Sequence, residues 1–265
     1  MQYCRFQTDQ GPQYGEVNQH QGEWWIEGVI EPPPEDRTIA RLIENFPAQP
    51  LSAFSLLAPV TPSKIVCIGR NYRDHAAELG NEAPKEPLLF LKAPSSLLPP
   101  GGIIRLPAIS QRVDFEGELG IVIGRTCYKL KPDEDVHPYI RGYVIVNDVT
   151  ARDLQKVDGQ WSRAKGFDTF CPVGPIVSDA VNPEGGVTVT TRLNGEVKQY
   201  GNTTDFIFNI ATLLRYISSA MTLNPGDLIP TGTPAGVGPM RSGDVVQVEI
   251  DGLGVLRNPV KMESS

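Results

Sequence analysis

The chain reads Val113-Asp114-Phe115-Glu116-Gly117-Glu118-Leu119-Gly120-Ile121-Val122-Ile123-Gly124, so two glutamates stand at the entrance to an apolar run. Because residues i and i+2 of a strand point to the same face, both carboxylates are predicted to project together, roughly 7 Å apart. The apolar run is typical of a strand that a sheet buries on both faces. Two like charges beside a buried region are unfavourable unless a positive group lies between them. A divalent cation with oxygen ligands is one explanation, and an exposed acidic sheet edge is the other.

Length and composition limit the classes of protein to consider. The 265 residues suffice for one large domain or for a large and a small one, and 26 glycines with 24 prolines favour a strand-rich fold. The net charge of −7 gives no indication of a nucleic-acid partner or an anionic membrane surface. No apolar run has the length of a membrane span, and no signal peptide is recognisable. Four scattered cysteines without a CxxC pair predict reduced thiols, as in a cytoplasmic protein.

The pattern of breaks divides the chain into a small N-terminal domain, 1–58, and a larger domain, 59–265. In the small domain we expect strands at 14–17 and 23–30 and a short helix at 38–46. In the larger domain the expected strands are 64–68, 88–92, 143–148, 187–193, 244–250 and 254–261. Asn194-Gly195 predicts a hairpin turn, and apolar residues at helical spacing predict an amphipathic helix over 207–221.

A third acid, Asp148, follows an apolar strand thirty positions after Glu118. Three carboxylates at strand ends would provide oxygen ligands suited to Mg²⁺ or Mn²⁺, whereas a lone Asp at such a place often caps a turn. Asp114 shares the predicted face of Glu116 and competes as a ligand. The residues alone do not choose between Asp114 and the other acids.

His75 and Glu78 lie in the segment that follows the predicted strand 64–68. If this segment is a short helix, the two residues share a face at spacing i, i+3. A carboxylate beside an imidazole orients the ring and raises its basicity, as a general base for water requires. A solvated His–Glu pair on an exposed helix is the alternative.

Two further segments offer groups that bind anions. Lys165 precedes an aromatic loop, and a lysine near acids can hold a substrate carboxylate or an enolate oxygen; a surface lysine is the commoner case. The loop 231–238 could present backbone N–H groups and the Thr233 hydroxyl to an anion, or it could be a simple turn. It lacks the GxxxxGK[ST] pattern, which excludes a nucleotide P-loop.

Taken together, these segments resemble the fumarylacetoacetate hydrolase superfamily over about residues 62–261. The motifs that carry the resemblance are GRNYRDH at 69–75, FLK at 90–92, EGELG at 116–120, NDVTARD at 147–153, KGFDTFCP at 165–172 and TGTPAGVG at 231–238. The resemblance implies an α+β, mainly β fold, in which a β-roll core carries a small N-terminal domain. It also implies a homodimer.

The resemblance assigns roles to individual residues. It implies that Glu116, Glu118 and Asp148 bind a catalytic Mg²⁺ or Mn²⁺, and it leaves Asp114 out of the ligand set. The catalytic residues that it implies are His75, Glu78 and Lys165. The substrate-binding residues that it implies are Gln155, Thr233, Arg70, Arg152 and Lys92. Pro230 departs from the family pattern, because a proline before the Thr233 turn removes a ladder donor.

The superfamily acts on 2-oxo acids that carry a second carbonyl or carboxyl group nearby. The function predicted first is a hydrolase that cleaves a C–C bond of acylpyruvate-type 2,4-dioxo acids. The cleavage would pass through a metal-bound enolate, with water activated by His75 and Glu78. The same enolate serves an oxaloacetate decarboxylase, an oxaloacetate tautomerase or a 2-hydroxy-dienedioate isomerase. A non-catalytic dicarboxylate-binding protein is the alternative of another class. The expected partner is a small 2-oxo acid, with no nucleic acid and no membrane.

Overall fold

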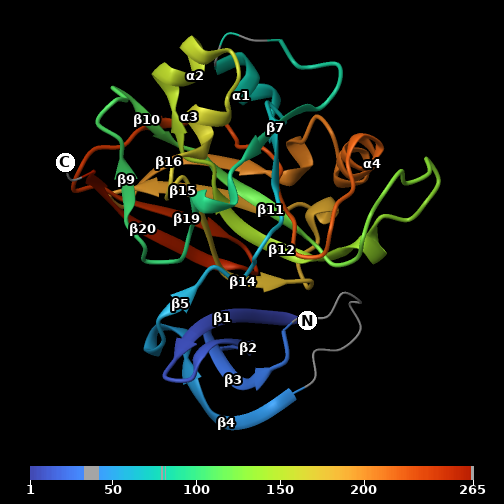
Figure 1. Ribbon diagram of the computed structural model, residues 1–265, viewed down its shortest axis with the longest axis vertical. Coiled ribbons are helices and arrows are strands. Elements are labelled where there is room, and N and C mark those ends of the chain that lie inside the picture. The colour runs from blue at the N-terminus through green and yellow to red at the C-terminus, as the bar shows by residue number, and fades with distance from the viewer. Residues whose placement is uncertain (33–41, 79, 81, 264–265) are drawn as a thin grey trace.

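The structure is a computed structural model that describes residues 1–32, 42–78, 80 and 82–263. Strands dominate the described chain, as the sequence predicts (Figure 1). The α-helices of the described residues are α1 (Arg73–Glu78), α2 (Arg152–Asp158), α3 (Ser162–Gly166) and α4 (Ile210–Ala220). None of the described helices is long and apolar enough to cross a membrane.

One large sheet runs through the molecule in the order β4-β3-β2-β1-β14-β12-β11-β17-β6-β7. Its first four strands are β1 (Gln2–Thr8), β2 (Gly11–His20), β3 (Glu23–Ile30) and β4 (Leu42–Pro50). The others are β14 (Cys171–Ser178), β12 (Ile140–Asn147), β11 (Gly117–Ile123), β17 (Leu228–Pro230), β6 (Ile65–Gly69) and β7 (Leu88–Lys92). Two short strands add to it, β5 (Leu56–Leu57) on β1 and β8 (Leu97–Leu98) on β14.

Two smaller sheets complete the fold. The first contains, in order, β16 (Glu196–Asn202), β15 (Thr188–Leu193), β19 (Val245–Ile250), β20 (Gly254–Met262) and β9 (Ile104–Leu106). The second contains β13 (Thr150–Ala151), β10 (Val113–Phe115) and β18 (Gly238–Pro239). In Figure 1, α1, α2 and α3 gather at the end of the molecule opposite β1–β4, which places the loops that carry the motifs together.

Most predicted elements of the larger domain are confirmed. Asn194 and Gly195 take φ values of 54° and 85° in the turn between β15 and β16, the left-handed backbone that an Asn-Gly hairpin requires. The predicted amphipathic helix is α4, whose first turn is capped because the Asn209 side chain accepts a hydrogen bond from Thr212 N at 2.8 Å.

The helix predicted at 38–46 is wrong over 42–46, because these residues begin β4; residues 38–41 lie outside the described part. β4 pairs with β3 in antiparallel register, with Leu42 opposite Ile30 and Pro50 opposite Trp25. The pairing supplies partners for the backbone of β3, and this long-range gain outweighs local helix propensity. The predicted boundary at residue 59 lies between β5 and β6, while β1 joins the N-terminal strands to β14.

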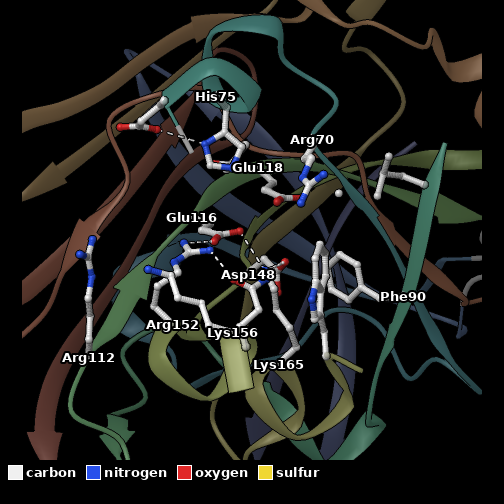
Figure 2. Close-up of a pocket in the computed structure, with 16 residues that line it drawn as sticks. Arg70, His75, Phe90, Arg112, Glu116, Glu118, Asp148, Arg152, Lys156 and Lys165 are labelled. Carbon is white, nitrogen blue, oxygen red and sulfur yellow. Dashed lines mark hydrogen bonds and ion pairs between the residues drawn. The ribbon is translucent and has the colours of Figure 1, made fainter. Parts of the chain in front are cut away.

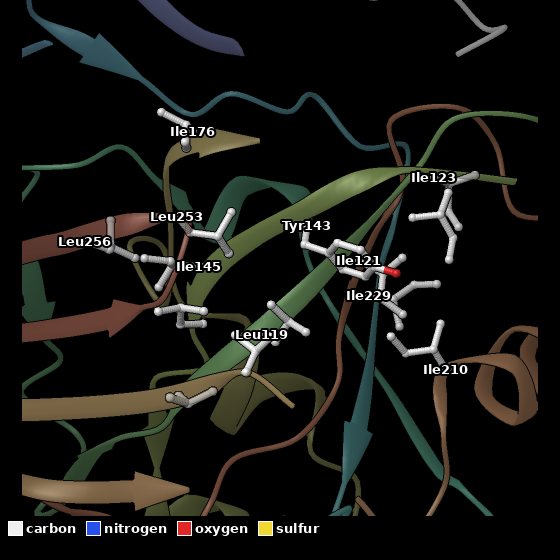
Figure 3. Packing of buried hydrophobic residues seen from close by; sticks show 14 of the residues in the cluster. Leu119, Ile121, Ile123, Tyr143, Ile145, Ile176, Ile210, Ile229, Leu253 and Leu256 are labelled. Atoms are coloured by element: carbon white, nitrogen blue, oxygen red, sulfur yellow. The ribbon is translucent and has the colours of Figure 1, made fainter. Parts of the chain in front are cut away.

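Apolar side chains are buried on both faces of the large sheet, as the segment 113–124 predicts. In β11, Leu119, Ile121 and Ile123 enter the core cluster that also contains residues of α4 (Figure 3). Val122 enters a second cluster on the other face. Full burial of each such side chain contributes about 1.5–3 kcal/mol. A strand fixed on both faces is a rigid base for the polar residues at its end.

Candidate metal and active site

Glu116 lies where the chain passes from one sheet to another. β10, before it, pairs with β13 and β18, whereas β11, after it, pairs with β12 and β17. The two glutamates therefore do not share one continuous strand, and that detail of the sequence interpretation is wrong. They nevertheless meet, because ligand oxygens of Glu116, Glu118 and Asp148 all lie within 4.8 Å of one another, closer than the strand spacing suggested.

Gly117 between the two glutamates allows a close approach of the neighbouring chain. A Cβ at this position would lie 2.1 Å from Thr191 Oγ1. The Gly117 N–H donates to Gln199 Oε1 at 2.9 Å, and its carbonyl accepts from Thr233 Oγ1 at 2.8 Å. The backbone between the acids is thus held on both sides, which fixes where the carboxylates point.

Asp148 and Glu116 are surrounded by cations. Lys92 Nζ donates to Asp148 Oδ1 at 2.7 Å, and Lys165 Nζ bridges Asp148 Oδ2 and Glu116 Oε2, the latter at 2.9 Å. The other Glu116 oxygen accepts from Arg152 Nη2 and from Thr150 Oγ1 at 3.1 Å. The backbone links the two acids as well, because Asp148 N donates to the Glu116 carbonyl at 2.8 Å.

Glu118 differs from the other two acids. Its carboxylate accepts one backbone hydrogen bond, from Gly232 N at 2.8 Å, and it has no ion pair among the described residues. Burial, with the nearby charges of Asp148 and Glu116, raises the pKa of Glu118 well above its usual range. A buried oxygen-only donor set with one carboxylate lacking a cation fits a hard divalent ion. Glu116, Glu118 and Asp148 are therefore suited to hold Mg²⁺ or Mn²⁺.

Lys165 is buried and remains a cation. Burial alone would lower its pKa, but Asp148 and Glu116 together raise the pKa of Lys165 above its ordinary value. Burial likewise opposes ionisation of Glu116, yet Lys165 and Arg152 hold the pKa of that carboxyl below its usual range. The Lys165 ammonium also lies 4.8 Å from the centre of the Phe90 ring. This lysine acts through charge and not as a base at neutral pH.

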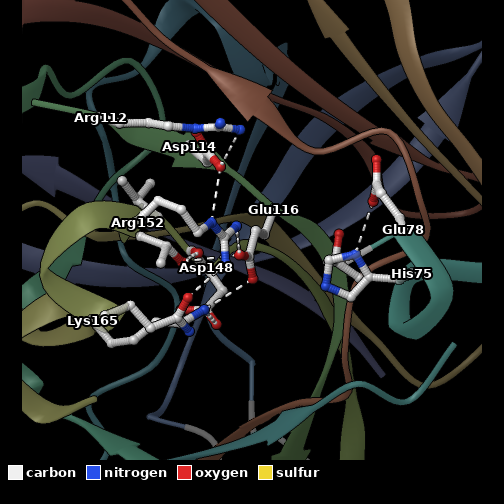
Figure 4. Close-up of polar contacts among 12 residues, drawn as sticks. His75, Glu78, Arg112, Asp114, Glu116, Asp148, Arg152 and Lys165 are labelled. Carbon is white, nitrogen blue, oxygen red and sulfur yellow. Dashed lines mark hydrogen bonds and ion pairs between the residues drawn. The ribbon is translucent and has the colours of Figure 1, made fainter. Parts of the chain in front are cut away.

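Asp114 lies outside the group that could hold a metal and instead organises two arginines (Figure 4). Its carboxylate accepts from Arg112 Nε at 2.8 Å and Nη2 at 3.1 Å, and from Arg152 Nε at 2.9 Å. Arg152 in turn donates through Nη1 to Gln155 Oε1 at 2.8 Å and through Nη2 to Glu116. Since the Gln155 oxygen is occupied, its amide N–H groups are the part available to a ligand. Each Arg152 nitrogen thus donates once to a protein group, and these bonds use three of its five N–H donors.

His75 and Glu78 form the predicted pair on α1, with His75 Nδ1 and Glu78 Oε2 3.2 Å apart. Figure 4 shows the buried imidazole between Glu78 and the acid cluster. The other Glu78 oxygen accepts from Gly236 N at 3.0 Å, which ties α1 to the loop 231–238. Just before α1, the buried Asn71 side chain donates to Thr231 O at 2.9 Å and accepts from Phe208 N at 2.8 Å. These contacts hold a helix of six residues that would not persist alone.

The glycine-rich loop uses its N–H groups on acids of the protein itself. Gly232, at φ 103°, donates to Glu118, and Gly236 donates to Glu78. The Thr233 hydroxyl gives its proton to the Gly117 carbonyl and accepts from Gln199 Nε2 at 2.7 Å, so it has only a lone pair left for a ligand. Pro230 does not disturb this turn, because the ladder resumes at once: Thr231 N donates to Leu119 O at 3.0 Å.

A cavity of about 460 Å³ opens above the acid cluster (Figure 2). Every residue predicted for the site lines it except Lys92, which is buried and reaches Asp148 and the Val149 carbonyl instead. The structure thus places Lys92 as support for Asp148 and not in contact with the cavity. Six lining residues were not predicted for the site, namely Ile68, Gly69, Phe90, Arg112, Lys156 and Trp161. Gly69 and Phe90 lie inside quoted motifs, whereas the other four residues carry no signal beyond their nearness to such motifs.

Comparison with known proteins supplies the family context. A family model described as fumarylacetoacetate (FAA) hydrolase C-terminal matches residues 64–261. The oxaloacetate tautomerase fahd2, mitochondrial, of Xenopus laevis is 45% identical over 221 residues, 79% of this chain and 69% of that protein. Oxaloacetate tautomerase YisK of Bacillus subtilis is 44% identical over 225 residues, 79% of this chain and 74% of that protein.

A solved structure extends the likeness to the whole chain. The 2-hydroxyhepta-2,4-diene-1,7-dioate isomerase from Mycobacterium marinum superposes with a TM-score of 0.89 at 41% identity, covering 100% of both chains. The resemblance drawn from six sequence motifs is confirmed by these matches, and so is the mainly β fold that it implied.

Proposed function

The chain belongs to the fumarylacetoacetate hydrolase family and is an enzyme of that superfamily, and we propose that it tautomerises a 2-oxo dicarboxylate of the oxaloacetate type. One observation carries the proposal: the acid cluster and the His75–Glu78 pair line the same cavity. The function predicted first from the sequence was acylpyruvate hydrolysis. The names of two relatives above 40% identity favour the tautomerase over the hydrolase.

Keto–enol conversion requires one proton to move at carbon and one at oxygen. His75, oriented by Glu78, is the group that exchanges the proton at the substrate carbon. The Gln155 amide N–H groups donate to a substrate oxygen, because Arg152 occupies the amide oxygen. Lys165 stays charged and favours negative charge developing on that oxygen.

Mg²⁺ or Mn²⁺ held by Glu116, Glu118 and Asp148 would supply a concentrated positive charge that stabilises an enolate. The protein's part is to keep these acids in place. Lys92 and Lys165 fix Asp148, Arg152 fixes Glu116, and the Gly232 N–H fixes Glu118.

The proposal is tested by following the enol absorbance of freshly dissolved enol-oxaloacetate with Mg²⁺ and with excess chelator. We expect the enol signal to decay faster with enzyme and Mg²⁺, without CO₂ release, and to return to the uncatalysed rate with chelator. Decay that ignores the chelator would refute the metal dependence. Release of CO₂ in step with the decay would replace the tautomerase by a decarboxylase.

Acylpyruvate hydrolysis is the second candidate, because a carboxylate-oriented imidazole beside an acid cluster can also activate water. Acetylpyruvate, assayed under the same conditions, distinguishes the two reactions. Chelator-sensitive acetate release with no acceleration of enol-oxaloacetate decay would establish the hydrolase instead.

A further inference from the structure

We propose that Lys156 and Arg112 form a second anion subsite on one side of the cavity and bind the distal carboxylate of a dianionic 2-oxo acid. This inference rests on the proposed function, because it presumes a 2-oxo acid in the cavity. It deepens the proposed function, because it assigns the preference for a dianion over a monoanion to two residues.

The cations nearest the acid cluster are already engaged. Lys92 is bonded to Asp148 and to a backbone carbonyl, and Lys165 bridges Asp148 and Glu116. Arg152 donates from all three nitrogens to protein groups. Breaking such buried pairs to bind a ligand leaves acids without partners, which is strongly unfavourable. A ligand anion away from the cluster must therefore find other cations.

Lys156 and Arg112 have that capacity. Lys156 lines the cavity, is exposed, and has no hydrogen bond or ion pair within the described part of the chain. Arg112 also lines the cavity, and its side chain is 50% exposed. Asp114 engages Arg112 through Nε and Nη2, which holds the guanidinium in place and leaves Nη1 free of protein acceptors. A fixed guanidinium and an exposed ammonium that line the same cavity are both suited to bind a carboxylate.

α2 brings Lys156 to the cavity, and Arg112 reaches the cavity from the residue before β10. Gln155 and Lys156 lie three and four residues after Arg152, so all three share one helix face. Figure 2 shows Lys156 and Arg112 on the same side of the acid cluster, with Arg70 on the other side near Glu118. Arg70, with a left-handed backbone (φ 56°) at the end of β6, also has no described partner. A ligand over the acid cluster therefore meets Lys156 and Arg112 on one side and Arg70 on the other, as a molecule with two carboxylates requires.

The test compares a dianion with its monoanion in the Mg²⁺-loaded enzyme. The probes are 3,3-difluorooxaloacetate, which has no proton to lose at C3, and 3,3-difluoro-2-oxobutyrate, which lacks the distal carboxylate. We expect Lys156→Met to weaken calorimetric binding of the dianion by about 10-fold, the effect of losing one charge-assisted hydrogen bond, and to leave the monoanion unchanged. Lys261→Met, an exposed lysine of β20 outside the cavity, should change neither.

Equal weakening of both probes, or of neither, would overturn the subsite. Arg112→Lys is the second variant, since it keeps the charge and loses the double hydrogen bond to Asp114; it too should weaken the dianion more than the monoanion. Substrate kinetics then separate the two proposals: Lys156→Met should raise KM for oxaloacetate and not for its 4-methyl ester. If the wild-type enzyme turns over neither substrate, the tautomerase proposal fails, while the calorimetric comparison still decides the subsite.

Discussion

The acid cluster and the His75 helix, which face each other across the cavity, are built in different ways. Glu116, Glu118 and Asp148 lie at the ends of strands that are buried on both faces, and several elements bond to their side chains. His75 lies on a six-residue helix held by Asn71 before it and by the contact of Glu78 with Gly236. The sheet thus holds the three acids that could bind a metal, and a separately anchored helix holds His75, the group proposed to transfer a proton. Metal affinity and turnover should therefore respond to different substitutions.

The largest effect is expected from Glu118→Gln. This carboxylate is the acid without a cation, so the amide should fit the protein but lose the charge that holds a divalent ion. We expect Mn²⁺ affinity to fall by more than about 100-fold and turnover to be lost in parallel. This exceeds the roughly 10- to 100-fold effect usual for residues that only hydrogen-bond to a metal ligand. Calorimetric titration with Mn²⁺ measures it. Affinity near that of the wild type would remove Glu118 from the ligand set.

His75→Asn should reduce turnover without changing metal affinity. The change removes the titratable ring next to Glu78 and leaves the acid cluster untouched. Turnover should fall by about 10²- to 10⁴-fold, the usual contribution of a general acid–base group, while Mn²⁺ affinity stays the same. Enol decay and Mn²⁺ titration on one preparation give both values. A parallel loss of metal affinity would show that the two regions are not independent.

Asp114→Asn tests the ion pairs of Asp114 with Arg112 and Arg152, called here the Asp114 clamp, which lie behind the acid cluster. Removal of this buried charge leaves the guanidinium of Arg152 without one of its partners, at a side-chain exposure of 6%. Loss of one member of a buried ion pair costs about 3–5 kcal/mol of unfolding free energy. Urea unfolding of the metal-free protein measures it. Asp158→Asn is the matched control, because its pair with the half-exposed Arg163 is screened by solvent and should contribute little to stability. Equal effects in both variants would contradict a structural role for Asp114.

The acid cluster was predictable in part, because its members adjoin apolar strands, while only the resemblance to the family excluded Asp114. Glu116, Glu118 and Asp148 could be placed at strand ends by periodicity alone, although periodicity did not reveal that the chain changes sheets at Glu116. The Asp114 clamp was not predictable from sequence. Asp114 and Arg152 are 38 residues apart and meet only through the pairing of β10 with β13. The helix expected at 38–46 failed for the same reason, since β4 depends on its partner β3.

The last expected effect concerns pH, and it follows from the raised pKa of Glu118. Burial, Asp148 and Glu116 keep this carboxyl protonated above the ordinary value of 4.5, so the native apo-protein holds a proton that the unfolded chain has released. Above pH 4.5 the native state therefore binds more protons, and stability of the apo-protein should fall as pH rises toward the folded pKa. A metal ion that displaces this proton removes the penalty. Its affinity should rise by about tenfold per pH unit over the same interval.

Thermal unfolding of the chelator-treated and the Mg²⁺-loaded protein between about pH 5 and pH 8 tests this linkage. The rise in Tm caused by Mg²⁺ should grow with pH, because binding to the native state becomes tighter while Glu118 loses its proton. In Glu118→Gln the apo-protein should lose the downward trend that this carboxyl contributes, since the amide does not titrate. If the variant keeps the same pH dependence as the wild type, another group carries the proton, and the asymmetry between Glu118 and its two neighbours is not the source of metal-linked stability.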